Sequence, residues 1–126
     1  MNLSGLSVSV GADDCDEGCA VVSFTGRAGL ADGAWLRRLL ELPEAQGPGR
    51  IILDLSQLSS IDWWTALILL WAGRMISRHG GTLVLAAPQP TVARLLKAAD
   101  ATQSVAVCQT VRQARVEATR VLERES

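Results

Sequence analysis

The chain has 126 residues, the usual size of one domain, and we interpret residues 1–126 as a single domain. Its 12 Lys and Arg residues nearly balance its 13 Asp and Glu residues, which gives a formal net charge of -1. This balance, without a basic run, argues against electrostatic binding of nucleic acid or of an anionic membrane. No segment reads as a secretion signal or as an apolar run long enough to cross a bilayer, so we expect a cytoplasmic protein.

The predicted elements follow from the spacing of apolar residues. Strands are predicted at Leu6–Val10, Ala20–Thr25, Ile51–Leu55, Thr82–Ala86 and Val105–Cys108. Helices are predicted at Gly33–Leu42, Trp63–Arg78, Thr91–Ala99 and from Val111 to about Glu123. The order is β-β-α-β-α-β-α-β-α, which predicts an α/β fold: a mixed β-sheet of about five strands, mainly parallel, with about four helices.

Local signals set the expected ends of these elements. Gly26 is expected to end the second strand, and Pro43–Gly49 reads as a loop. The strand at Ile51–Leu55 is almost entirely apolar, so it should lie in the centre of the sheet. Asp62 is expected to cap the following helix, and Gly80 to end it in a left-handed conformation.

The cysteines and the single histidine do not suggest chemistry. The cysteines are Cys15, Cys19 and Cys108, an odd number that is typical of a reducing compartment. Free thiols are the preferred interpretation, and a Cys15–Cys19 pair across a hairpin loop is the alternative. His79 is the one side chain suited to act as a base near neutral pH, and no phosphate-binding glycine motif is present. We therefore predict no metal, no cofactor and no catalytic residue.

The strongest functional signal lies between Ile51 and His79. A strand ends in Leu53-Asp54-Leu55-Ser56, and Ile61-Asp62 then opens a turn before an apolar helix. Together with the stretch GGTLVLAAPQPTV at 80–92, this pattern resembles the STAS domain, the family of bacterial anti-sigma factor antagonists. The resemblance implies the STAS fold and a role in transcription regulation. Its implied partner is an anti-sigma factor of the histidine-kinase-like type or a related STAS protein.

The sequence departs from the family where a switch is expected. Family members that a kinase switches have Ser or Thr just after the aspartate of this turn. Trp63 and Trp64 stand at those positions here, and Thr65 stands where the family has glycine. Gly29 replaces an acidic residue that the family often has near the acceptor. The resemblance therefore implies a regulator that is not phosphorylated at the family position; the fallback acceptors are Thr65, Ser60 and Ser59.

A helical wheel divides the predicted Trp63–Arg78 helix into two sides. The inner side contains Thr65, Ile68, Leu69, Ala72 and Ile76. The outer side contains Trp63, Leu67, Leu70 and Trp71, flanked by Trp64 and followed by Arg74 and Arg78. Because exposed tryptophans and leucines on one face are typical of an interface, we predict a partner-binding surface. It comprises Asp62, Trp63, Trp64, Leu67, Leu70, Trp71 and Arg74.

Three other interpretations of this surface stay open. It could be covered by the chain's own closing helix or its first residues. It could form a homodimer or a scaffold with related chains. It could also line a small-molecule sensor, with Trp63 and Trp64 in a pocket. None of these alternatives involves nucleic acid or a membrane.

Overall fold

The sheet is organised around its central strand, β3 (Arg50–Ile61). The structure is a computed structural model that describes residues 6–11, 19–28, 34–100 and 105–125. The first half of β3 contributes four fully buried apolar side chains, those of Ile51, Ile52, Leu53 and Leu55. They are buried because helices cover both faces of the sheet at this strand. The predicted central position of this strand is confirmed.

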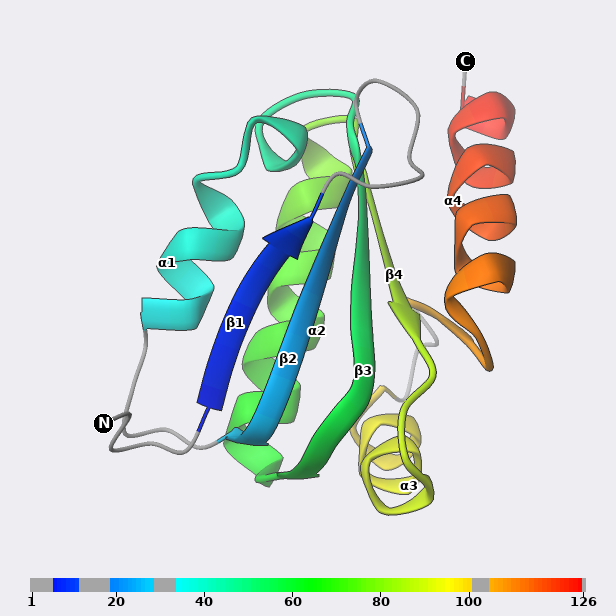
Figure 1. The fold of residues 1–126 in the computed structure, drawn as a ribbon. Helices are drawn as coiled ribbons and strands as arrows, with labels where there is room; N and C mark the ends of the chain where they lie inside the picture. The colour runs from blue at the N-terminus through cyan, green and yellow to red at the C-terminus, as the bar shows by residue number, and fades with distance from the viewer. Residues whose placement is uncertain (1–5, 12–18, 29–33, 101–104, 126) are drawn as a thin grey trace.

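The five strands lie side by side in chain order, β1-β2-β3-β4-β5 (Figure 1). Besides β3 they are β1 (Leu6–Gly11), β2 (Cys19–Ala28), β4 (Thr82–Ala86) and β5 (Ala106–Cys108). β1 pairs antiparallel with β2, and the remaining neighbours pair in parallel. This arrangement confirms the predicted opening hairpin and the mainly parallel sheet.

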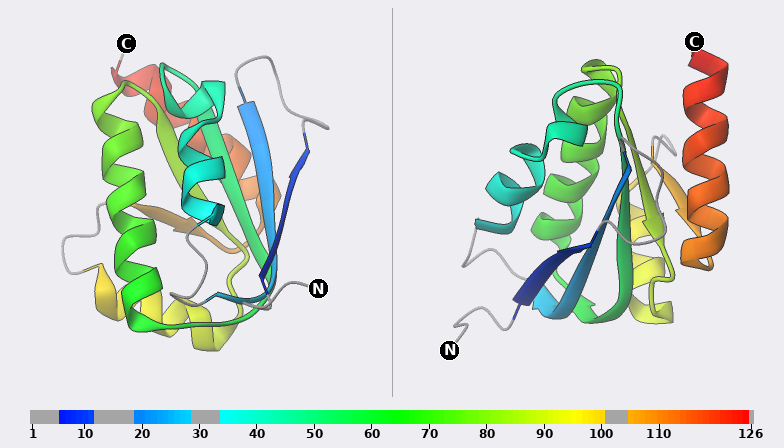
Figure 2. Two further views of the ribbon diagram at one scale, coloured as in Figure 1. Left: turned by 90° about the vertical axis from the view of Figure 1, so that its left-hand side faces the viewer. Right: turned by 45° about the horizontal axis from the view of Figure 1, so that its top comes forward.

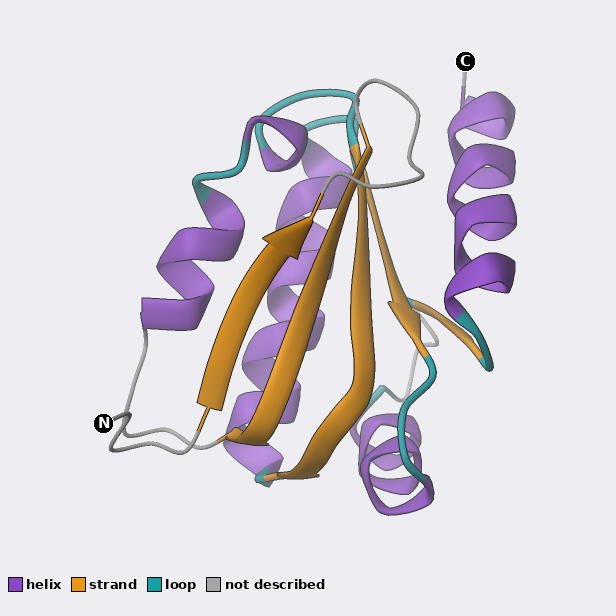
Figure 3. Ribbon diagram, viewed as in Figure 1, coloured by secondary structure: helices purple, strands orange, loops and turns teal. Residues whose placement is uncertain are grey.

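Four α-helices alternate with the strands in the predicted order. They are α1 (Ala34–Leu40), α2 (Trp63–Arg78), α3 (Pro90–Ala99) and α4 (Val111–Glu125). A short 3-10 helix, η1 (Pro43–Ala45), lies within the stretch predicted as a loop. α1 and α2 cover one face of the sheet and α4 covers the other, while α3 packs against β3 and α2 (Figures 1 and 2). Figure 3 shows the sheet between these helices.

Each face of the sheet has its own core. On the face of α1 and α2, the core includes Trp35, whose ring meets Phe24 edge-on at 5.7 Å. On the opposite face, Ala114 and Ala118 of α4 pack near Ile52. Trp35 is therefore a core residue. Because α4 lies across the sheet from α2, the interpretation that the closing helix covers the tryptophans of α2 is wrong.

Two strands run beyond their predicted ends. β2 continues through Gly26 to Ala28. The glycine adopts a φ of +102°, and the register of the pairing between β2 and β3 shifts there, so the strand passes the glycine without ending. β3 continues past Leu55 to Ile61 and pairs there with β2 alone, since β4 pairs only with Arg50–Asp54. The ends predicted at Gly26 and Leu55 are therefore wrong. The polar stretch before α2 is strand, not turn.

Candidate protein-interaction surface

Asp62 fixes the turn from β3 into α2. Its backbone is extended, with φ -87° and ψ 167°, and its Oδ1 accepts a hydrogen bond of 2.7 Å from the backbone N–H of Thr65. This bond satisfies one of the amides that a helix leaves unpaired at its start. The predicted N-cap is confirmed, and it sets the direction in which Trp63 and Trp64 leave the chain.

The other end of α2 is closed as predicted. The backbone N–H of His79 donates to the carbonyls of Met75 and Ile76, and the His79 Nδ1 lies 2.8 Å from the Met75 oxygen. Gly80 follows with a φ of +88°, the left-handed conformation that favours glycine. α2 is therefore a helix with both ends defined by local contacts.

Thr65 points into the protein. Its side chain is 2% exposed, and its Oγ1 is buried without a hydrogen-bond partner. The inward position that the wheel predicts is confirmed. A hydroxyl in this position cannot reach the surface unless the first turn of α2 opens.

The exposed side of α2 carries three tryptophans. Trp63 is 44% exposed, Trp64 61% and Trp71 46%. Leu67 lies between them and is half-buried. We call these four side chains the tryptophan face. Their exposure confirms that α2 presents apolar rings outward between Trp63 and Trp71, with the exposed Arg74 one turn further on.

Leu70 does not belong to this face. The sequence places it on the outer side, but it is 1% exposed and part of the main core, so that placement is wrong. The reason is that α2 packs against α1 and α3 as well as against the sheet, so the buried side of the helix extends to Leu70. Gly73 shows the same tight packing, since a Cβ built on it would lie 2.7 Å from Val105 Cγ2.

The serines before the turn lie nearer the surface than Thr65. Ser59 is exposed, and its Oγ donates a hydrogen bond of 2.9 Å to the Gly26 carbonyl, whereas Ser60 is half-buried. Asp54, at the end of the apolar run, accepts a hydrogen bond of 3.0 Å from the Ser56 amide. Two positions discussed above, Cys15 and Gly29, lie outside the described residues.

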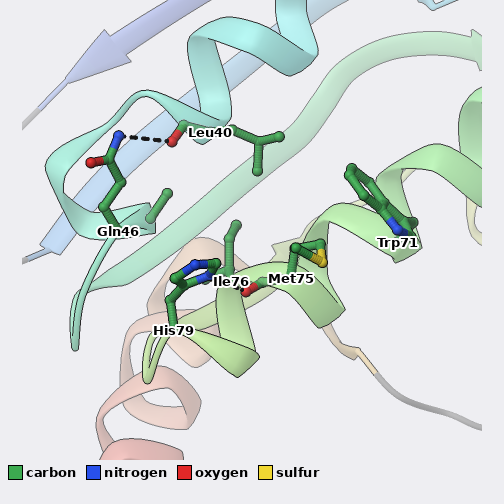
Figure 4. A pocket seen from close by; sticks show the side chains of 7 residues that line it. Leu40, Gln46, Trp71, Met75, Ile76 and His79 are labelled. Atoms are coloured by element: carbon green, nitrogen blue, oxygen red, sulfur yellow. Dashed lines mark hydrogen bonds between the residues drawn. The ribbon is translucent and has the colours of Figure 1, made fainter.

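A pocket opens beside the tryptophan face, between α2 and the segment formed by α1 and η1 (Figure 4). It has a volume of about 240 Å³ and is lined by Leu40, Ala45, Gln46, Trp71, Met75, Ile76 and His79. Gln46 Nε2 donates a long hydrogen bond of 3.4 Å to the Leu40 carbonyl at its edge. The pocket is smaller than most small-molecule sites, which measure roughly 300–1,000 Å³. Its size suits one apolar side chain of a partner.

Sequence reasoning did not find this pocket. Trp71, Met75 and His79 follow one another at intervals of four residues, so they form a continuous line along α2. That spacing is visible in the sequence. The contribution of Leu40 and Gln46 is not, because it depends on how α1 packs against α2.

Two further features bear on the kind of site. Within the described ranges, no three His, Cys, Asp or Glu side chains come together as a metal site would require. Of the helices that the structure describes, none combines the length and the apolar character needed to span a bilayer.

These features define an α/β domain with a mixed sheet and a capped helix that presents aromatic side chains. The family model described as the STAS domain matches residues 16–114, and the chain belongs to the STAS domain family. The predicted family is thereby confirmed. No curated protein matches the sequence.

Solved structures show the same fold. A putative anti-sigma factor antagonist from Thermotoga maritima is 24% identical, with a TM-score of 0.63 over 91% of this chain and 95% of that one. An anti-sigma factor antagonist from Mycobacterium paratuberculosis is 18% identical, with a TM-score of 0.71 over 90% of this chain and 95% of that one. The murine anion transporter Slc26a9 is 16% identical, with a TM-score of 0.71 over 91% of this chain and 22% of that one. At these identities the likeness is one of fold.

Proposed function

We propose that this chain is a non-catalytic protein-interaction module, an antagonist-like regulator that binds an anti-sigma factor of the histidine-kinase-like type. The binding surface is the tryptophan face together with Asp62 and Arg74. The observation that carries the proposal is the exposure of three tryptophans on one helix that nothing else in the described chain covers. Proteins rarely leave such a patch in water unless it binds something.

The chemistry of the surface suits a protein partner. Tryptophan buries a large apolar area and still donates one N–H, and both tryptophan and arginine are enriched among the residues that dominate binding energy. The pocket beside Trp71 adds a cavity for an apolar anchor of the partner. The four side chains of the tryptophan face themselves include no base and no nucleophile, which suits a non-catalytic role.

The surface also supports binding without a phosphate switch. At a helix start, a phosphate would meet unpaired amides and the positive end of the dipole, and its charge could eject a partner. Trp63 and Trp64 offer no acceptor there, and the Thr65 hydroxyl is buried. The contact we propose is therefore constitutive.

Calorimetry with a purified kinase-type anti-sigma factor from the same organism tests this function. Trp63→Ala and Trp71→Glu should each weaken binding by about 2 kcal/mol or more, roughly 30-fold, as expected for central interface residues. Val116→Ala is the matched control, because Val116 is also exposed, at 56%, but lies on α4 across the sheet. Equal affinity of the two tryptophan variants and the wild-type chain would contradict the proposal.

A further inference from the structure

The exposed side of α2 combines two kinds of side chain in a fixed order. Trp63 and Leu67 lie in its first half, Trp71 lies just past its midpoint, and Arg74 and Arg78 lie in its last two turns. The intervals are four, four, three and four residues, which keeps all five on one narrow stripe. The stripe runs along the middle of the exposed arc and is about 22 Å long at 1.5 Å per residue.

The two halves of the stripe complement each other. α2 contains no Asp or Glu, so its arginines find no anion on their own helix. The side chains of Arg74 and Arg78 are exposed, and they make no ion pair with any residue that the structure describes. Their place near the carboxyl end suits the helix dipole. An arginine guanidinium also stacks favourably on the face of an indole, and the indole of Trp63 lies at the opposite end of the same helix from Arg78.

We propose that a second copy of this chain docks on this stripe, with the two α2 helices antiparallel about a two-fold axis. When two such helices cross at their midpoint, between residues 70 and 71, Trp63 of one copy meets Arg78 of the other. Leu67 meets Arg74 in the same way, along the stem of the arginine, and the two Trp71 rings lie beside the axis. Each contact occurs twice, as an isologous interface requires.

This arrangement needs no change in the fold. α1 and α2 lie side by side on this face of the sheet (Figure 2), and the tryptophans of α2 are exposed. A parallel pair would instead place Arg74 against Arg74 and Arg78 against Arg78, which like-charge repulsion disfavours. The charges on the stripe therefore favour the antiparallel arrangement.

Sedimentation velocity of the chain alone, from about 1 to about 100 µM, tests the pairing with three variants. The first carries Trp63→Arg and Leu67→Arg, which set cations against Arg78 and Arg74 of the other copy. The second carries Arg74→Glu and Arg78→Glu, which remove the cations from the tryptophans. The third, Val116→Arg, is the control, because it adds a charge to the exposed face of α4.

We expect the wild-type chain and the control to sediment as dimers at the upper concentrations. Each double variant alone should be monomeric, with a dissociation constant raised at least about 100-fold. An equimolar mixture of the two double variants should give a heterodimer, because the new arginines of one meet the new glutamates of the other. All changed positions are exposed or half-buried in α2 or α4, so the circular dichroism spectrum should not change.

Three results would overturn the inference. A wild-type monomer at all concentrations rules out the dimer. Double variants that remain dimeric show that a different face pairs. A mixture that stays monomeric beside a dimeric wild-type chain rules out the antiparallel arrangement. Because no anti-sigma factor is present, each result is independent of the proposed function.

Discussion

At the scale of single residues, Asp62 and Thr65 act together at the start of α2 but contribute to stability in different ways. Asp62 accepts a hydrogen bond from the Thr65 amide, whereas the Thr65 hydroxyl is buried without a partner. A buried hydroxyl without a hydrogen bond costs free energy relative to an apolar group of similar shape. The backbone of Thr65 therefore supports the turn, and its hydroxyl does not.

Replacing the hydroxyl should separate these effects. Thr65→Val is expected to leave the free energy of unfolding unchanged or to raise it by up to about 1 kcal/mol, because no hydrogen bond is lost. Asp62→Ala is expected to lower it by about 1 kcal/mol, the usual cost of losing an N-cap. Urea denaturation followed by circular dichroism measures both. A loss of more than about 1 kcal/mol in Thr65→Val would mean that the hydroxyl has a partner after all.

At the scale of elements, α2 is held closely against its neighbours at Gly73. A Cβ at this position would lie 2.7 Å from Val105 Cγ2 and 3.3 Å from Leu83 Cδ2. Val105 is buried and β-branched, so its side chain has little freedom to turn aside. Glycine weakens a helix by about 1 kcal/mol relative to alanine, and here the close contact with β4 and Val105 requires it.

Gly73→Ala should therefore destabilise the chain despite the better helix propensity of alanine. We expect a net loss of about 1–2 kcal/mol in the free energy of unfolding, since overpacking usually costs about 1–3 kcal/mol. In a Val105→Ala background, the same change should be neutral or stabilising. Thermal denaturation of the wild-type chain, the two single variants and the double variant gives the coupling energy between the two substitutions. Additive changes in the free energy of unfolding would show that the Val105 side chain does not obstruct a Cβ at residue 73.

The elements also show what the sequence could predict. Local signals sufficed for the Asp62 cap, the glycine after α2 and the apolar run of β3, because each depends on residues near one another in the chain. The sequence misplaces Leu70 because the burial of this side chain depends on how α2 is surrounded in the fold. It does not predict the part of β3 after Leu55, because the register of its pairing with β2 shifts there and breaks the alternation of a strand.

At the scale of the whole molecule, one helix carries nearly all the exposed aromatic surface. Three of the four tryptophans lie in α2 and are exposed, and the fourth, Trp35, is buried in the core. A partner that binds α2 therefore changes the surroundings of three of the four tryptophans, and with them most of the tryptophan fluorescence. A single spectroscopic signal reports on the surface on which both proposals depend.

Dilution should shift this fluorescence if two copies pair. On going from about 100 to about 1 µM, the emission maximum should move to longer wavelength as the α2 tryptophans return to water. Trp35→Phe should keep the shift, whereas replacing Trp63, Trp64 and Trp71 by phenylalanine should abolish it. An emission maximum that is independent of concentration, in a chain that sediments as a dimer, would place the dimer contact elsewhere.

The order of the strands in the sheet has a consequence for synthesis. Each strand pairs with the strand that precedes it in the chain, from β1 to β5. The sheet can therefore grow in one direction as the chain leaves the ribosome, without waiting for a distant segment to insert between strands already paired. The last element, α4, then closes the face that the earlier crossovers leave open.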